Sequence, residues 1–218
     1  MNMFGYGEDG LTLVYFCTQL QSFLSLMDDN SDPESCSIYY RASFGRRGGF
    51  GEIDAIVVAS KRIYLCESKW NDRDRSEVRR IQLDDAQVRR DRVFHKLVAS
   101  WREQNPSTWE DFREQNAAGF EGFKLPGAER TLSRNLWSML GLLREHACEC
   151  QNVLLYFYRS EMMDGLPLTV LDKLGNILTD YRTVKCKYAH DDLGPNFRLP
   201  TLWPEGKLGV DFQKTHCP

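Results

Sequence analysis

The sequence lacks an apolar run long enough to cross a membrane, and its amino terminus has no basic stretch followed by an apolar one. A membrane-spanning helix needs about 20 apolar residues in succession, and a secretory signal needs a basic segment before its apolar core. The acidic pair Glu8 and Asp9 lies where such a segment would begin. These absences predict a soluble, cytoplasmic protein without a membrane partner.

Cysteine motifs are missing too, although the chain contains seven cysteines. Their number is odd, and no two of them form a C-x-x-C pair. The closest two, Cys148 and Cys150, have no matching pair of Cys or His at zinc-finger spacing. The pattern argues against a zinc finger or a dithiol redox site and favours free thiols in a reducing compartment.

The chain also lacks the basic excess of proteins that coat nucleic acid. Its net charge is -3 and its pI is near 5.9, so any contact with phosphates must be local. Arg46 and Arg47 lie in a glycine-rich turn with little to pack against, which predicts contact with a phosphate backbone. A second run of arginines between residues 73 and 92 alternates with acids, which leaves helix salt bridges and phosphate contacts both open.

The 218 residues, 42% of them apolar, can bury one substantial core and leave little room for a second. Apolar residues at helical spacing predict helices over residues 11–27, 74–103 and 132–148. Runs of β-favouring residues predict strands over 38–44, 53–58, 62–68 and 153–158, with weaker ones over 168–171 and 183–188. We therefore expect an α/β fold, with a central mixed β-sheet flanked by helices, in a single domain of residues 1–218.

The expected core of this domain covers about residues 9–158. Within it, Gly and Pro in the segment 109–130 predict an inserted short helix and loop. Residues 159–218 form an expected C-terminal extension, which should be irregular beyond Gly194.

Three ionisable residues lie inside two neighbouring strands that are otherwise apolar. Asp54 interrupts the first strand, whose apolar side chains should alternate between two faces, with Ile53, Ala55 and Val57 on one and Ile56 and Val58 on the other. Glu67 and Lys69 lie in the second strand, on one face with Ile63 and Leu65. The three ionisable groups should therefore converge.

Charges buried in such strands cost on the order of several kcal/mol each unless a partner compensates them. A divalent cation would do so, because the carboxylates of Asp54 and Glu67 and the backbone carbonyl of Ser68 make a hard oxygen site that suits Mg²⁺ or Mn²⁺. Lys69 could then position and help to deprotonate an attacking water and stabilise charge on a phosphate. The pattern predicts metal-dependent hydrolysis of phosphodiester bonds by Asp54, Glu67 and Lys69.

A plainer alternative is a structural salt bridge, in which Lys69 pairs with Asp54 or Glu67 at a strand end without a metal. This alternative accounts for two charges more easily than for three. The D-x12-E-x-K spacing is short, but its setting favours the nuclease: it follows a helix and a strand, spans a hairpin, and precedes a helix and another strand.

The sequence resembles the restriction-endonuclease-like, or PD-(D/E)xK, nuclease superfamily. The resemblance rests on Gly51-Glu52-Ile53-Asp54 followed by Glu67-Ser68-Lys69-Trp70, within the order helix, three strands, helix, strand. It is similar to the branch with nuclease-related domains, Mrr-type enzymes and archaeal Holliday-junction resolvases, although Ile53 stands where the superfamily has proline. The resemblance implies an αβββαβ core in which Asp54 and Glu67 bind the metal and Lys69 assists the water.

Two further residues match positions of this branch. Glu8 stands near the start of the first helix, where members often carry an acidic metal ligand; the alternative is a carboxylate favoured by the helix dipole. Gln87 matches a glutamine on the helix after E-x-K, whose amide can bond a phosphate or the attacking water; the alternative is a solvated side chain. The resemblance thus adds Glu8 as a metal ligand and Gln87 as a nucleic-acid contact.

The leading hypothesis is a Mg²⁺- or Mn²⁺-dependent DNA endonuclease acting in restriction, phage defence or repair, with DNA favoured over RNA as substrate. Because one such core has one active site, cleavage of both strands would most simply use a homodimer. One alternative is a catalytically inactive module that keeps the nuclease fold to bind nucleic acid or a protein partner. Another is a nuclease subunit of a larger complex.

Overall fold

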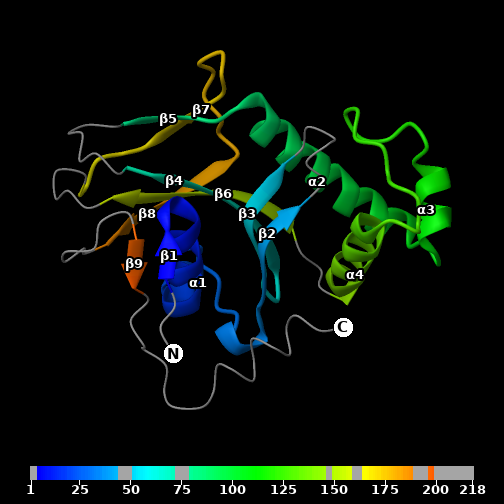
Figure 1. Cartoon of the computed structure of the whole chain (residues 1–218), viewed down its shortest axis with the longest axis horizontal. Helices are drawn as coiled ribbons and strands as arrows, with labels where there is room; N and C mark the ends of the chain where they lie inside the picture. The colour runs from blue at the N-terminus through cyan, green and yellow to red at the C-terminus, as the bar shows by residue number, and fades with distance from the viewer. Residues whose placement is uncertain are drawn as a thin grey trace.

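The computed structural model describes residues 4–43, 51–71, 79–145, 149–158, 164–188 and 196–198; of residues 4–6, 144–145 and 196–198 it describes the backbone alone. This part of the chain forms an α/β fold, in which helices flank a mixed five-stranded sheet (Figure 1). No helix in these ranges is both long and apolar enough to cross a membrane. The predicted fold class and mixed sheet are therefore confirmed.

The central sheet has the strand order β2-β3-β4-β6-β8. Its members are β2 (Ser37–Ser43), β3 (Glu52–Val58), β4 (Arg62–Trp70), β6 (Glu149–Tyr158) and β8 (Tyr181–Lys187). The first three pair antiparallel, and β4, β6 and β8 pair parallel. Two small sheets join β1 (Phe4–Tyr6) to β9 (Asn196–Arg198) and β5 (Arg80–Gln82) to β7 (Thr169–Leu171).

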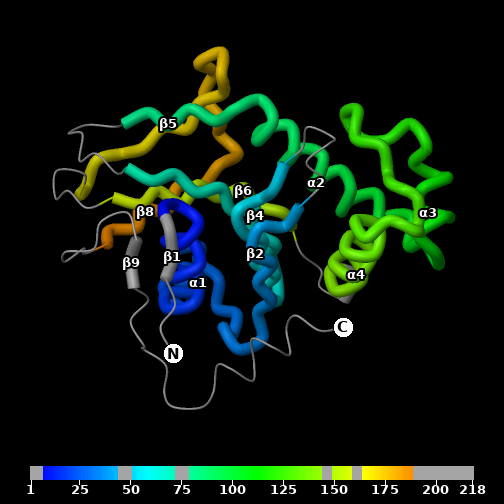
Figure 2. Tube along the Cα trace, in the orientation of Figure 1, coloured from blue at the N-terminus to red at the C-terminus, as the bar shows by residue number. Residues whose placement is uncertain are grey.

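One face of the sheet is covered by α1 (Gly7–Leu26), which a 3-10 turn (Pro33–Ser35) and β2 follow. Its buried aromatic residues Phe16 and Phe23 pack against small and apolar side chains of β3, β4 and β6, including Ala55, Cys66 and Val153. The trace in Figure 2 shows α1 lying beside these strands. Phe23 meets the ring of Tyr64 on β4 edge to face, at a centroid distance of 5.2 Å, which adds to the stabilisation from burial.

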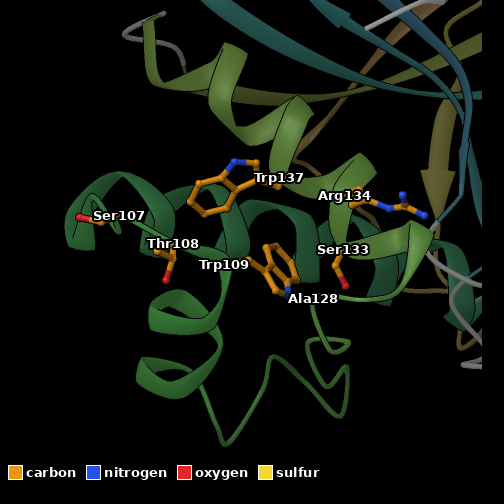
Figure 3. Close-up of a pocket in the computed structure, with 7 residues that line it drawn as sticks. All are labelled: Ser107, Thr108, Trp109, Ala128, Ser133, Arg134 and Trp137. Atoms are coloured by element: carbon orange, nitrogen blue, oxygen red, sulfur yellow. The ribbon is translucent and has the colours of Figure 1, made fainter.

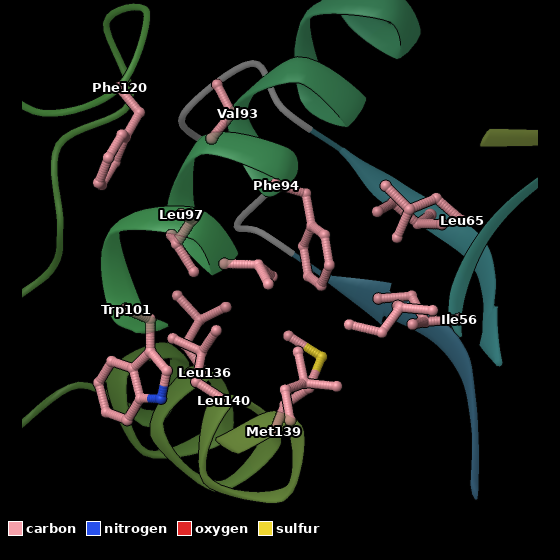
Figure 4. Close-up of a cluster of buried hydrophobic side chains, with 14 of the residues drawn as sticks. Ile56, Leu65, Val93, Phe94, Leu97, Trp101, Phe120, Leu136, Met139 and Leu140 are labelled. Carbon is pink, nitrogen blue, oxygen red and sulfur yellow. The ribbon is translucent and has the colours of Figure 1, made fainter. Parts of the chain in front are cut away.

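The other face is covered by α2 (Asp85–Gln104) and α4 (Thr131–Glu145), with the short α3 (Trp109–Gln115) between them in sequence. Apolar residues of α2 recur at helical spacing and face the strands, as Figure 4 shows for Phe94 and Leu97 against Ile56 and Leu65. Leu140 of α4 fills the space beneath α2. This second core fixes the position of α2 over β3 and β4.

The helix predicted over residues 74–103 begins later than expected. Residues 80–82 form β5, and Ile81 is buried opposite Val170 of β7. The helix itself begins at Asp85, after a capping box in which the Gln87 side chain bonds the Asp84 backbone. The prediction was wrong over residues 79–84 because β5 depends on a partner strand far along the chain.

Other boundaries differ as well. β6 begins at Glu149, four residues before the predicted start at residue 153. The strand therefore starts immediately after the segment 132–148 that was predicted to be helical. Residues 196–198 form β9, within a tail that was predicted to be irregular. The short helix predicted inside the insertion 109–130 is confirmed as α3.

The expected side-chain alternation of β3 breaks at Asp54. Ile53 belongs to the core cluster of Ile56 and Val58, and not to that of Ala55 as predicted. On the partner strand, Arg41 lies opposite this break with a left-handed φ of 53°. A residue in this conformation interrupts the regular pleat, so the sequence period alone could not assign Ile53 to its face.

The buried face of α4 provides a matched test of this packing. Leu140 is fully buried, whereas 41% of Leu142 on the same helix is exposed. Leu140→Ala should lower the free energy of unfolding by about 2–5 kcal/mol because it leaves a cavity in the core, and Leu142→Ala should lower it by about 1 kcal/mol or less. Urea unfolding of both variants measures the difference, and equal losses would contradict the described packing.

Candidate active site

The candidate site lies where β3 and β4 stop pairing. The two strands are in register from Ala55–Cys66 to Val58–Ile63, whereas β4 continues beside β6 as far as Trp70. Beyond this point carboxylates bond the backbone of β4. The N–H of Ser68 donates to Asp54 Oδ2 at 2.8 Å, and the N–H of Trp70 donates to Glu8 Oε2 at 2.8 Å.

Asp54 therefore faces the backbone of the residue predicted to supply a carbonyl ligand. In a β-strand the N–H and C=O of one residue point to the same edge. Because the N–H of Ser68 points to Asp54, its carbonyl also lies on the Asp54 side of β4. Two of the predicted metal-binding groups, the Asp54 carboxylate and the Ser68 carbonyl, are thus brought to one edge.

The side chain of Ser68 connects this edge to the start of α1. Thr12 Oγ1 donates to the carbonyl of Glu8 at 2.8 Å, and Thr12 Oγ1 and Ser68 Oγ lie 2.6 Å apart. Since a threonine hydroxyl has one hydrogen, Ser68 is the donor to Thr12. Both hydroxyl residues are fully buried, so this pair holds the first turn of α1, and with it Glu8, against β4.

Glu67 points to the opposite face of β4, toward α2. It is 1% exposed, and both of its carboxylate oxygens accept hydrogen bonds from α2. Gln87 Nε2 donates to Oε2 at 2.8 Å, and the Arg90 guanidinium forms an ion pair with Oε1. The helix cap fixes Gln87, whose amide oxygen accepts from the Asp84 N–H at 3.0 Å. Gln87 is half-buried, and its side chain turns inward and orients Glu67.

Lys69 is half-buried and lies near the carboxylates of Glu8 and Asp54. Its charge opposes the rise in pKa that burial causes for Glu8 and for Asp54, so its ammonium acts on both groups. In the described ranges no ion pair involves Lys69. The plainer alternative, a salt bridge from Lys69 to Asp54 or Glu67, is thus not seen among the described residues, and Glu67 pairs with Arg90.

Burial and mutual repulsion disfavour negative charge in this site. Burial, together with the nearby charge of Asp54, raises the pKa of Glu8 to about 7. Burial also raises the pKa of Asp54 and of Glu67, while Arg90 opposes the rise at Glu67. Asp54 is close enough to repel both glutamates, and an added cation would relieve all three.

The donor atoms fit a divalent cation in part. Asp54 retains an oxygen that is not bonded to Ser68, and each carboxylate oxygen can accept more than one bond. Over the part of the chain that the structure describes, however, no three Asp, Glu, His or Cys side chains are grouped so that they could hold a metal. Glu8, Asp54 and Glu67 thus do not form one three-carboxylate group, and Glu8 is bonded to the Trp70 backbone.

Arg90 and its neighbour Asp91 belong to the run of arginines and acids between residues 73 and 92, but the sequence did not predict them as residues of this site. Asp91 is 1% exposed, accepts a hydrogen bond from the Tyr181 hydroxyl, and has a pKa raised by burial to about 7. Its other oxygen, Oδ1, is buried without a partner among the described residues. Positions 87, 90, 91 and 94 share one face of a helix. The apolar stripe that continues to Trp101 could therefore have shown that Arg90 and Asp91 face the sheet.

Arg46 and Arg47, predicted to contact phosphates, are outside the described residues. A pocket of about 350 Å³ opens where α3 and α4 begin; none of the predicted site residues lines it (Figure 3). The residues that line it are Ser107, Thr108, Trp109, Ala128, Ser133, Arg134 and Trp137.

Glu8→Gln should make the pH dependence of stability shallower in metal-free protein. The folded-state pKa of Glu8 is raised from 4.5 to about 7, so between these values the folded protein binds more protons than the unfolded chain. Stability should therefore fall as the pH rises through this window. Glutamine can still accept from the Trp70 N–H but carries no charge.

Chemical unfolding in EDTA across this pH window measures the effect. Glu110→Gln, at an exposed position of α3, is the matched control and should keep the wild-type slope. An unchanged slope in Glu8→Gln would contradict the described burial of Glu8.

Comparison of the chain with family models, with curated proteins and with solved structures finds no match. No relative therefore supplies a function or a site for this chain. The side chains that can indicate a function are those where β3 and β4 diverge, namely Asp54, Glu67 and Lys69.

Proposed function

We propose that this protein is a metal-dependent nuclease with a restriction-endonuclease-like αβββαβ core, which hydrolyses phosphodiester bonds of DNA. The observation that carries the proposal is the bond from the Ser68 N–H to Asp54 Oδ2, beside Glu67 and Lys69 on the same strand. It brings the acid of β3 to the E-x-K segment of β4. The order α1, β2, β3, β4, α2, β6 agrees with this core, with β5 inserted before α2 and with α3 and α4 inserted after it.

The proposed metal site consists of Asp54, Glu67 and the backbone carbonyl of Ser68, with Mg²⁺ or Mn²⁺ as the ion. Oxygen donors of this kind are the ones these ions prefer. When bound, the ion would lower the pKa of a water and neutralise charge on the phosphate. The raised pKa values of Asp54 and Glu67 support the proposal, because such groups gain most from a cation.

Three side chains, those of Lys69, Gln87 and Glu8, would complete the proposed site. The ammonium of Lys69 would donate hydrogen bonds to the attacking water and to a phosphate oxygen, and so stabilise the charge that develops there. Gln87 would hold Glu67 in orientation through the cap of α2. Glu8 would keep the end of β4 in place through the Trp70 N–H instead of binding the metal.

Positive charge beside the site supports a polyanionic substrate. Lys69, Tyr156 and Lys185 are register partners on β4, β6 and β8, so their side chains lie in one row on one sheet face. Lys69 and Lys185 are two strand spacings, about 10 Å, apart at the backbone. Lys185 Nζ donates to the Leu166 carbonyl at 2.9 Å, which fixes its ammonium beside this row.

A binding module without catalysis is the second candidate. It is favoured by one observation: both oxygens of Glu67 are bonded to α2, one of them in a buried ion pair. If that arrangement persisted with nucleic acid bound, Glu67 would be a structural residue. Either candidate could act as a homodimer or as a subunit of a larger complex. Metal-dependent cleavage of nucleic acid separates the two candidates.

Replacing Lys69 should separate catalysis from metal binding. Lys69→Ala should cleave DNA at least on the order of 10²-fold more slowly than wild type, because it loses the group that stabilises developing charge. It should still bind Mg²⁺ or Mn²⁺ in calorimetry. Asp54→Asn should lose both metal affinity and cleavage, while its side-chain oxygen can still accept from the Ser68 N–H.

Lys61→Ala is the matched control, since Lys61 is exposed at the opposite end of β4. It should cleave at the wild-type rate. Cleavage of circular and linear DNA and of RNA, in Mg²⁺, Mn²⁺ or EDTA, gives the readout. Wild-type rates in Lys69→Ala would remove Lys69 from catalysis, and no cleavage by wild type in any metal would favour the binding module.

Lys185→Ala should weaken nucleic-acid binding without changing the metal site. Loss of one phosphate contact should reduce the slope of log affinity against log salt by about 1. Fluorescence anisotropy at several salt concentrations, with Ca²⁺ in place of Mg²⁺ to limit cleavage, measures this slope. Lys173→Ala, at an exposed loop position, should keep it; equal slopes in both variants would exclude Lys185 from the interface.

A further inference from the structure

We propose that Arg90 is a built-in counter-cation of the candidate site, which positions Glu67 when no metal is bound and competes with a divalent ion for the same carboxylate. The inference rests on the metal site of the proposed function. It assigns a role to a residue that the E-x-K resemblance does not include.

The position of Arg90 supports this role. The residue is 5% exposed and pairs with Oε1 of Glu67, which is itself 1% exposed. Its guanidinium also reaches the start of β3, where a methyl group added at Gly51 would lie 3.1 Å from Nη1. Gly51 has a φ of 65°. The Arg90 side chain thus reaches from α2 to the residue that precedes β3, the strand that carries Asp54.

The charge of Arg90 acts on three acids, of which Glu67 and Asp91 are buried and Asp54 is half-buried. It lowers the pKa of Glu67, of Asp54 and of Asp91, against the effect of burial on each. A buried carboxylate without a partner is strongly destabilising. Arg90 therefore supplies in the metal-free protein the compensation that a divalent cation would supply in the metal-bound one.

Two cations that share one buried carboxylate repel each other. At short distance in a partly dry site this repulsion is much stronger than in water. Metal binding to Glu67 must therefore displace Arg90 or act against its charge. Arg90 therefore stabilises the metal-free fold and lowers the affinity of the site for a divalent ion.

Arg90→Met removes the charge and the hydrogen bonds and keeps a long apolar side chain in the same space. In EDTA its Tm should fall by roughly 10 °C or more, since Glu67 then lacks a buried counter-charge. Addition of Mg²⁺ or Mn²⁺ should raise its Tm by more than it raises that of wild type, because the ion now compensates Glu67 without competition.

Two controls separate charge from packing. Arg90→Lys retains a cation and should respond to metal more like wild type. Arg92→Met makes the same change at an exposed position of α2 and should match wild type in EDTA and in metal. If Arg90→Met does not fold, the double variant Glu67→Gln/Arg90→Met keeps the test open. It should regain stability in EDTA and lose the metal response.

A thermal-unfolding titration of these proteins with Mg²⁺ and Mn²⁺ tests the role of Arg90. A larger metal-induced rise in Tm for Arg90→Met than for wild type supports the inference. An equal rise in both would overturn the inference and leave the metal site standing. No rise in either, with no heat of metal binding, would reject the metal site and with it the proposed function.

Discussion

The separation of β4 from β3 beyond Cys66 is the constraint on which the candidate site depends. An unpaired strand edge inside a protein must satisfy its N–H groups, and here Asp54 and Glu8 accept from Ser68 and Trp70. This arrangement requires carboxylates inside the fold. The same acids then need positive charge, which the chain supplies with Lys69 and Arg90.

The two helices beside the sheet have different tasks in this site. The buried hydroxyl pair of Thr12 and Ser68 fixes the start of α1, and so Glu8, to β4. The first turns of α2 supply Gln87 and Arg90 to Glu67 from the other face. Glu67 and Asp54 are thus held by different elements, and their relative position depends on the packing of α2 over the β3–β4 hairpin.

Local sequence patterns predicted the elements that depend on local periodicity. The stripe of α1 and the apolar runs of β3 and β4 were sufficient to predict these three elements, and to place Asp54 on the strand next to the E-x-K segment. The break at Asp54 was not predictable, because it accompanies a left-handed Arg41 on another strand. The Arg90–Glu67 pair was missed because it depends on how α2 lies on the sheet, although the helical stripe contained the signal.

The most direct test of the account is a crystal structure of the protein soaked in Mn²⁺, with data collected for anomalous scattering of the ion. We expect one peak bound by Asp54, Glu67 and the Ser68 carbonyl, with the Arg90 guanidinium moved away from Glu67. A fully bonded Glu67 with no peak beside it, at Mn²⁺ concentrations that saturate ordinary carboxylate sites, would contradict the account.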